Sequence, residues 1–290
     1  PPPLPPEPAL DLVPRFALLD HANQALGRLD GMSTLLPNTS LFVYLYVQKE
    51  ALLSSQIEGT QSTLTDLLLF ETHAAPSAPI ADVEEVSNYV AAINHGLRRP
   101  LPVLVRAALA HVQFETIHPF LDGNGRLGRL LITLMLCHEG ALQAPTLYLS
   151  LYLKTHRDRY FELLNRVRNH GDWEAWIDFF LEGVLEVSNQ ATSAARQILD
   201  LFETDHRRIQ GLGRRASTIL RVHDHFQRHP IATVRAAADA TGLSFPACSK
   251  AVAALQVAGV LEEITGRQRD RIFKYEAYLS ILSDGAEPIR

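Results

Sequence analysis

The chain has 290 residues, of which 47% are hydrophobic and 20% are charged, with a formal net charge of −5 at pH 7. This length and composition predict a globular protein of about two domains. They exclude a membrane-spanning helix, because no apolar run reaches the roughly 20 residues required. Two cysteines, Cys137 and Cys248, allow at most one disulfide, and their apolar helical contexts favour buried thiols and a cytoplasmic location. No signal peptide is visible, although the chain begins at Pro1 rather than Met.

The first 80 residues predict a proline-rich arm followed by helices. PPPLPPEP has the composition of an extended arm, and helical patterning begins around Phe16 and continues through LFVYLYVQKEALLSSQIEG. Near the end of that stretch, Ser54 and Glu58 are four residues apart on one helical face, and Gly59 then breaks the helix. Taken alone, Glu58 is best interpreted as a solvated residue near a helix end.

A polar stretch, HPFLDGNGRLGR, lies between two apolar helical segments in the middle of the chain. The first of these helices should stop at about Ile117, because Pro119 disfavours the helical conformation at His118. Gly123 and Gly125 can adopt positive φ angles, and Asn124 tolerates them better than most residues do. Successive N–H groups in such a loop form an anion-binding concavity.

The next helix is predicted to start near Arg126, which adds the positive end of a helix dipole. Arg126 and Arg129 share a face of its first turn, where cations are unfavourable unless an anion lies between them. Asp122 offers an oxygen ligand of the kind that Mg²⁺ prefers beside phosphates, and His118 titrates near neutral pH and could act as a general base. Together these residues predict a metal-assisted nucleotide phosphate site.

Each of these residues has a simpler interpretation on its own, as a structural histidine, an Asp-Gly turn or a solvated arginine. Coincidence of the whole set is much less probable. The common phosphate loop GxxxxGK[ST], the HExxH motif and paired CxxC motifs are all absent from the sequence.

HPFLDGNGRLGR resembles the signature of the Fic family, HxFx(D/E)GNGRxxR, and matches it at every specified position. The flanking LAHVQFETIHPF and GRLLITLMLC are also similar to Fic proteins. The resemblance implies a mainly α-helical fold that transfers AMP from ATP to a hydroxyl of a Tyr, Ser or Thr residue in a target protein, with release of pyrophosphate. Relatives that use ATP as a phosphate donor instead carry a lysine where Arg126 stands.

The resemblance also implies a role for each motif residue. His118 would be the base that deprotonates the target hydroxyl, Asp122 would hold Mg²⁺, Arg126 would contact the ATP phosphates and Arg129 the γ-phosphate. Three further residues would line the anion hole, namely Gly123, Asn124 and Gly125. Tyr160 lies in a stretch that lines the adenine pocket in relatives, although aromatic residues at its spacing are more often core.

SSQIEGT is similar to the inhibitory motif (S/T)xxxE(G/N) of Fic proteins, here on the N-terminal side of the core. In that class a glutamate pairs with the second arginine of the signature and obstructs the γ-phosphate. The resemblance therefore implies that Ser54 and Glu58 belong to an inhibitory helix in which Glu58 pairs with Arg129.

Fic proteins ordinarily carry a helix and a β-hairpin flap before the motif helix, and the flap aligns the target segment. Here only RRPLP separates NHGL from the next helix, so the flap is expected to be missing from this sequence near residues 98–100.

The last quarter of the chain predicts a second, basic domain. Residues 214–276 contain ten Lys and Arg against six Asp and Glu. Three helices are predicted over residues 214–228, 233–242 and 244–259, followed by strands VLEEIT and RIFKYEAY joined by GRQRD, which is the pattern of a winged helix. Its third helix carries one cation, Lys250, so DNA is only weakly supported as its partner. Three arginines in the hairpin turn could contact phosphate, namely Arg267, Arg269 and Arg271.

The sequence therefore predicts a mainly α protein with four parts: an arm and inhibitory segment over residues 1–75, a Fic core over 76–195, a connecting helix or linker over 196–213 and a winged-helix domain over 214–290. The favoured function is an ATP- and Mg²⁺-dependent protein adenylyltransferase restrained by Glu58, with a possible homodimer. Two alternatives are a DNA-binding regulator with a nucleotide-sensing domain and a hydrolase that removes AMP from a modified protein.

Overall fold

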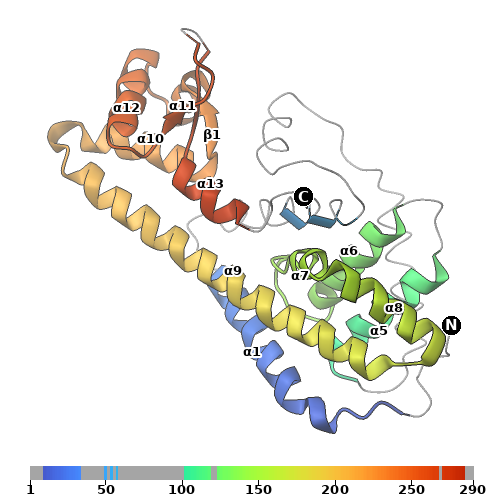
Figure 1. Cartoon of the computed structure of the whole chain (residues 1–290). Coiled ribbons are helices and arrows are strands. Elements are labelled where there is room, and N and C mark those ends of the chain that lie inside the picture. Colours follow the sequence, from blue (N-terminus) through green and yellow to red (C-terminus); the bar gives the residue numbers. More distant parts are fainter. Residues whose placement is uncertain are drawn as a thin grey trace. The chain divides into compact units, whose positions relative to one another are not determined.

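The computed structural model describes residues 9–33, 49–50, 53–54, 57, 101–118, 123–267 and 270–284. These residues are mainly helical, as the sequence predicted, and they form two compact units (Figure 1). The described residues up to Thr192 belong to the first unit, and Ser193 to Asp284 form the second. The described residues of the predicted arm and of the predicted Fic core up to Thr192 therefore lie in one unit.

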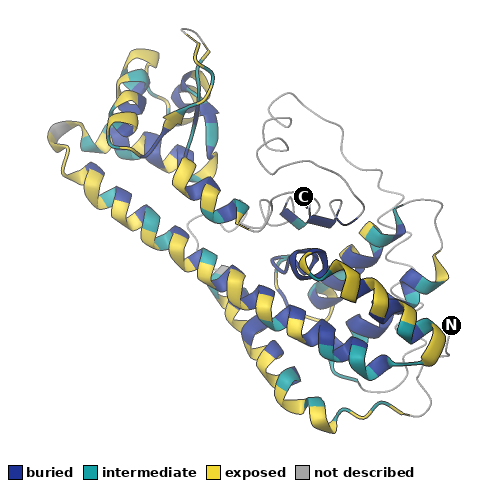
Figure 2. Ribbon diagram, in the orientation of Figure 1, coloured by how far each residue is buried: buried dark blue, intermediate teal, exposed yellow. Residues whose placement is uncertain are grey.

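The first unit is built from helices alone in its described part. In chain order they are η1 (Val13–Arg15), α1 (Phe16–Ser33), α5 (Val103–Ile117), α6 (Asn124–His138), α7 (Ser150–Thr155), α8 (Arg157–His170) and the first part of α9 (Trp173–Gln210). The residues of α5 are buried nearly all round, whereas α8 is buried on one side (Figure 2). A helix that is apolar around its circumference belongs in the centre of a core, and α5 lies there.

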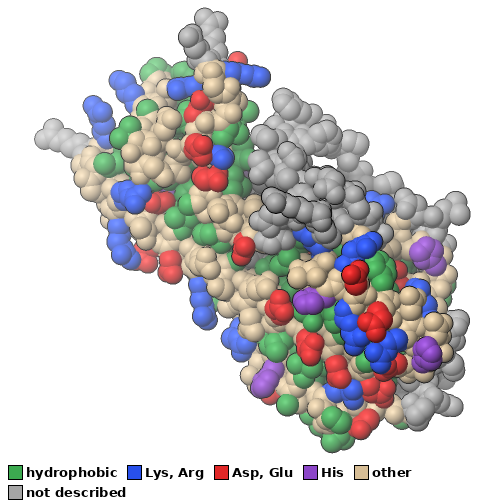
Figure 3. Space-filling view, viewed as in Figure 1, with side chains coloured by type: hydrophobic (Ala, Val, Ile, Leu, Met, Phe, Trp, Pro, Cys, Tyr) green, Lys and Arg blue, Asp and Glu red, His purple; other side chains and the backbone are tan. Residues whose placement is uncertain are grey.

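Aromatic packing fixes α5 against its neighbours. Trp176 of α9 is fully buried, and its indole Nε1 donates a hydrogen bond of 2.9 Å to the carbonyl of Ala108. In the same unit, Nε of Arg15 forms a 2.7 Å ion pair with Asp178, which joins η1 to α9. On the outer surface of α8, cationic and acidic side chains alternate (Figure 3), and the ion pairs there join Arg159 and Arg166 to acidic neighbours.

Most of the predicted connecting helix or linker over residues 196–213 is the continuation of α9, which runs without a break to Gln210. From Ser193 onward this helix belongs to the second unit. The ring of Phe202 lies 5.0 Å from that of Tyr278 and 5.9 Å from that of Tyr275, centroid to centroid. This part of α9 therefore contributes core to the second unit.

The second unit combines helices with a small antiparallel sheet. After α9 come η2 (Gly213–Arg215), α10 (Ala216–Arg228), β1 (Ile231–Thr233), α11 (Val234–Thr241), α12 (Phe245–Val257), β2 (Glu262–Glu263), β3 (Ile272–Lys274) and α13 (Glu276–Ser283). The strand order is β1-β3-β2, with Lys274 of β3 opposite both Ile231 and Glu262. The three predicted helices and the predicted hairpin are present.

Two details of this unit differ from the prediction. Strand β1 was not predicted, and the second predicted strand, residues 271–278, is a strand only to Lys274, because α13 begins at Glu276. The apolar residues after Lys274 explain the change, since Tyr278, Leu279 and Leu282 are all buried and recur at helical spacing. The winged-helix assignment itself stays a prediction.

Candidate functional site

Helix α5 ends where the sequence predicted, at Ile117, and His118 caps it. The His118 N–H donates to the carbonyl of Phe114 at 3.0 Å, and its backbone is left-handed, with φ 50° and ψ 59°. The helical conformation is disfavoured before Pro119, and this conformation leads the chain out of the helix with the imidazole exposed. A non-glycine residue with positive φ is uncommon and is often found at functional sites.

Helix α6 begins at Asn124, two residues earlier than predicted. Gly123 is its N-cap and alone takes the predicted positive φ, at 80°, whereas Gly125 lies inside the first helical turn. The left-handed glycine lets the chain enter the helix at once, so the positive end of the helix dipole, rather than an extended loop, is presented here, and such a helix end favours an anion.

The guanidinium of Arg126 is exposed and lies beside Gly123. A Cβ atom added to Gly123 would be 3.4 Å from Nη2 of Arg126, so this side chain runs back toward the start of α6, as helical side chains do. It therefore places a positive charge at the same end of α6 as the positive end of the helix dipole. That end of α6 is suited to a phosphate.

Arg129 is in a different environment, because only 2% of its surface is exposed. Its Nε donates to Oγ of Ser54 at 2.8 Å, and its Nη2 donates to the backbone carbonyl of Ser54 at 2.9 Å. Two N–H groups of one guanidinium thus bind a single residue of the predicted inhibitory segment. Glu58, the predicted partner of Arg129, lies outside the described residues, as do Asp122 and the predicted flap position.

The described residues between 49 and 57 are helical, and they contact other parts of the first unit at several points. Leu53 and Ile57 are fully buried. The Nε of Arg157, the first residue of α8, donates to the carbonyl of Ile57 at 3.1 Å, and the ammonium of Lys49 lies 4.7 Å from the ring centre of Tyr148. We refer to these described residues as the inhibitory segment, after the role that the sequence resemblance implies for Ser54 and Glu58.

Glu50 anchors the inhibitory segment at the start of α7. Its carboxylate accepts hydrogen bonds from the backbone N–H of Ser150, at 3.1 Å, and from the Ser150 hydroxyl. Burial raises the pKa of Glu50 to about 7, although the Ser150 hydrogen bonds and the charge of Arg129 act in the opposite direction. Sequence analysis did not identify Glu50, yet Glu50, Ser54 and Glu58 recur at four-residue spacing, and that pattern was a usable signal.

His111 and Tyr160 meet in the interior, behind the start of α6. Tyr160 is 1% exposed, and its hydroxyl lies 2.9 Å from Nε2 of His111, whose Nδ1 is 2.8 Å from the carbonyl of Gly128. Burial, and to a smaller degree the charge of Arg129, lower the pKa of His111 to about 4. In this packing Tyr160 is a core residue, which was the simpler alternative to its predicted adenine contact.

The described residues contain no group of three His, Cys, Asp or Glu side chains that could hold a metal ion. Since Asp122 is not among them, its predicted role as a magnesium ligand stays a prediction. The same part of the chain has no helix long and apolar enough to cross a membrane.

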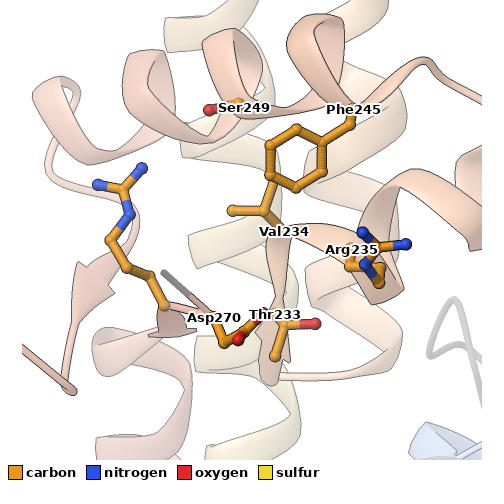
Figure 4. Close-up of a pocket in the computed structure, with 7 residues that line it drawn as sticks. Thr233, Val234, Arg235, Phe245, Ser249 and Asp270 are labelled. Atoms are coloured by element: carbon orange, nitrogen blue, oxygen red, sulfur yellow. The ribbon is translucent and has the colours of Figure 1, made fainter. Parts of the chain in front are cut away.

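The second unit has a pocket of about 330 Å³ between the starts of α11 and α12 and the hairpin (Figure 4). Seven residues line it: Thr233, Val234, Arg235, Phe245, Ser249, Asp270 and Arg271. Of the predicted cationic contacts, Arg271 lines this pocket, Arg267 and Lys250 are exposed, and Arg269 lies outside the described residues. None of the predicted nucleotide-site residues takes part in it.

Comparisons with known proteins point to one family. Residues 16–98 match the family model described as Fic/DOC family N-terminal. A probable protein adenylyltransferase of Aquifex aeolicus (strain VF5) is 35% identical over 80 residues, which are 27% of this chain and 24% of that protein. The protein adenylyltransferase Fic of Drosophila yakuba is 36% identical over 103 residues, and that of Aedes aegypti is 38% identical over 76. These alignments cover 34% and 26% of this chain, but only 19% and 14% of the respective relatives.

Among solved structures, a Fic family protein from Desulfovibrio desulfuricans G20 aligns with 89% of this chain and 95% of its own, at 18% identity and a TM-score of 0.46. A score below 0.5 does not establish a common fold, so the assignment rests on the sequence matches. The family match and the curated relatives show that this chain is similar to Fic proteins over part of its length, and it spans no more than about a quarter of the length of the curated relatives compared here.

Proposed function

We propose that this chain is a protein adenylyltransferase that transfers AMP from ATP to a hydroxyl side chain of a target protein. One observation carries the proposal: the start of α6 combines a left-handed Gly123 with the exposed guanidinium of Arg126, and His118 caps the helix that precedes it. Curated relatives of the chain are named protein adenylyltransferases, which supports the same activity.

In the proposed reaction, the target hydroxyl oxygen attacks the α-phosphorus of ATP while the imidazole of His118 takes its proton. The bond from the α-phosphorus to the oxygen bridging the β-phosphate breaks, and pyrophosphate leaves. The N–H groups of Asn124 and Gly125 and the Arg126 guanidinium stabilise the phosphate charge at the helix end. Mg²⁺, which we assign to Asp122, would neutralise further phosphate charge.

We also propose that the inhibitory segment restrains this reaction by occupying Arg129. The supporting contacts are the two hydrogen bonds from the Arg129 guanidinium to Ser54. Glu58 would follow one turn later as an ionic partner of the same group, so the γ-phosphate of ATP would have to displace the segment to reach Arg129.

Label transfer from ATP tests the proposed reaction. Wild type, Glu58→Gly and Glu58→Gly with His118→Ala would each receive ATP labelled on either the α- or the γ-phosphate, with Mg²⁺ present. We expect protein label from the α-phosphate only, more of it in Glu58→Gly than in wild type, and none without His118. Label from the γ-phosphate would instead identify a kinase and contradict the proposal.

For the second unit we propose a winged-helix module that recognises a partner, in support of which Arg235 and Arg271 flank one concave surface (Figure 4). Duplex DNA is the partner to test first, by measuring its affinity for wild type and Arg271→Glu over a range of salt concentrations. Affinity that falls steeply with salt and is reduced in the variant supports a phosphate contact. Absence of DNA binding would leave the target protein or a second copy of the chain as the partner.

We place the protein in the cytoplasm, in keeping with the free thiols of Cys137 and Cys248.

A further inference from the structure

His111 lies where α5, α6 and α8 meet, and none of its surface is exposed. Both ring nitrogens have partners: Nδ1 is 2.8 Å from the carbonyl of Gly128, and Nε2 is 2.9 Å from the hydroxyl of Tyr160. A carbonyl can only accept, so Nδ1 carries a proton. Burial lowers the pKa of His111 to about 4, so Nε2 is unprotonated near pH 7 and accepts from the hydroxyl of Tyr160. The ring is therefore a neutral imidazole held in one tautomer, and it stacks on Trp176 at 5.8 Å between centroids.

The carbonyl that His111 binds belongs to the peptide unit that joins Gly128 to Arg129. On the same residue, a Cβ atom would come within 2.5 Å of Oε1 of Glu115 and 3.1 Å of Cδ1 of Phe114, so these two side chains of α5 pack directly against the backbone of Gly128. Helix α6 is thus fixed at Gly128 by contact at its Cα and by a hydrogen bond at its carbonyl. Both act on the backbone that carries Arg129.

We propose that His111, oriented by the hydroxyl of Tyr160, is a positioning residue that sets the backbone of Arg129 and so aims its guanidinium at the γ-phosphate of ATP. The proposal rests on the proposed function for its ligand. His111 does not touch the reacting atoms. A displacement of about 1 Å in such a supporting contact is enough to impair a site by orders of magnitude, which is why the effect should be measurable.

The test compares Tyr160→Phe with Tyr275→Phe as a matched control. Tyr160 and Tyr275 are both buried, and both hydroxyls are hydrogen-bonded, but Tyr275 binds Asp205 in the second unit at 2.6 Å. Each variant loses one buried hydroxyl and keeps its ring. A purely structural role for Tyr160 would lower stability in both variants and leave Arg129 unaffected.

The first readout needs no nucleotide. In the otherwise wild-type protein, the Nε proton of Arg129 donates to Ser54 and should give a slowly exchanging ¹⁵N–¹H signal. We expect Tyr160→Phe to speed its exchange by about threefold or more, and Tyr275→Phe to change it by less than about twofold. An unchanged Arg129 signal in Tyr160→Phe would overturn the positioning role, whatever the enzyme does.

The second readout uses the Glu58→Gly background, in which Arg129 is available to ATP. Adding Tyr160→Phe should raise the KM for ATP by about tenfold and change kcat by less than about threefold, because ground-state binding to Arg129 is weakened. His111→Asn, whose amide can still donate to Gly128, should recover part of the loss seen in His111→Leu. If Glu58→Gly itself neither binds ATP nor transfers AMP, the proposed function fails, and the Arg129 signal still decides the role of His111.

Discussion

Each unit of the molecule contains a buried tyrosine whose hydroxyl lies beside a histidine, and the two pairs have different surroundings. In the first unit, the hydroxyl of Tyr160 lies 2.9 Å from Nε2 of His111. The other ring nitrogen, Nδ1, is bonded to the carbonyl of Gly128, which belongs to the peptide unit before Arg129. In the second unit, Tyr275 lies 3.3 Å from Nε2 of His223 but donates a shorter bond of 2.6 Å to the carboxylate of Asp205.

The difference shows that a shifted side-chain pKa alone does not identify a functional site. Burial lowers the pKa of both histidines, and burial together with Asp205 raises the pKa of Tyr275 well above its usual range. The second pair joins α9 and α10 to the residue between β3 and α13, whereas the first acts on the backbone of a residue that also binds the inhibitory segment. A group with a shifted pKa is a candidate functional residue only when its hydrogen-bond partners also position a residue of the site.

The largest expected effect separates the two histidines. His111 has bonds of 2.8 and 2.9 Å, whereas both bonds of His223 are 3.3 Å. His111→Leu should therefore lower the free energy of unfolding of the first unit by about 3 kcal/mol, and His223→Leu that of the second by about 1 kcal/mol. Both tryptophans belong to the first unit, so their fluorescence in urea follows it, and far-UV circular dichroism follows the whole chain. Equal losses of unfolding free energy in the two variants would show that the two histidines do not differ in this way.

The two units should also differ in their response to pH. The pKa of Glu50 is raised to about 7, so its contribution to stability is complete below the ordinary carboxyl pKa and is lost as the pH rises through 7. In the second unit, burial lowers the pKa of His223 and that of His225, the latter to about 4, so protonation destabilises it as the pH falls below about 6.5.

Glu50→Gln should therefore make the first unit more stable relative to wild type at about pH 7.5 than at about pH 5, by a difference on the order of 2 kcal/mol. Urea unfolding followed by tryptophan fluorescence at the two pH values measures it. The second unit should be insensitive to this substitution. A constant difference between variant and wild type would show that Glu50 is not protonated on docking.

A smaller effect is expected from a methyl group at Gly128. Gly128→Ala should displace α6 from Glu115 and Phe114, lower the unfolding free energy by about 1 kcal/mol and weaken ATP binding in the Glu58→Gly background. Gly27→Ala in α1 is the control, because no atom of the described residues lies within 4 Å of its added Cβ, and it should stabilise the protein by up to about 1 kcal/mol. Denaturation and calorimetric ATP titration of both variants distinguish the close helix contact from a general effect of alanine.

The smallest effect concerns the contact from α8 to the inhibitory segment. Arg157→Met removes the hydrogen bond to the carbonyl of Ile57 and should raise AMP transfer by about twofold. Arg159→Met, which removes only an exposed ion pair with Glu162, should leave the rate unchanged. Equal rates in the two variants would show that α8 does not hold the segment.

The sequence was sufficient to predict the helical class and the end of α5 at Ile117. It placed the start of α6 two residues late, because Gly123 and Asn124 are poor helix formers and only the N-cap geometry shows that the helix begins directly after Gly123. It left open whether residues 196–213 form a connecting helix or a linker, since a continuous helix such as α9 can pass from one packed unit into another without a change in local pattern.

The contacts that hold the site could not be read from local patterns. His111 is one polar residue in an apolar helix, and its partners lie 17 and 49 residues away. Arg157 binds a carbonyl 100 residues away, and backbone acceptors leave no signature in the sequence. Long-range packing therefore supplied the positioning residues, whereas local chemistry supplied the motif.

The central claim is that Arg129 is shared between the inhibitory segment and ATP, and the rate of label transfer from α-labelled ATP in Ser54→Ala tests it most directly. Loss of the hydroxyl that accepts from Arg129 should raise the rate by about three- to tenfold over wild type, while Ser54→Thr, which keeps an oxygen at this position, should stay near the wild-type rate. A rate in Ser54→Ala equal to or below that of wild type would contradict the account.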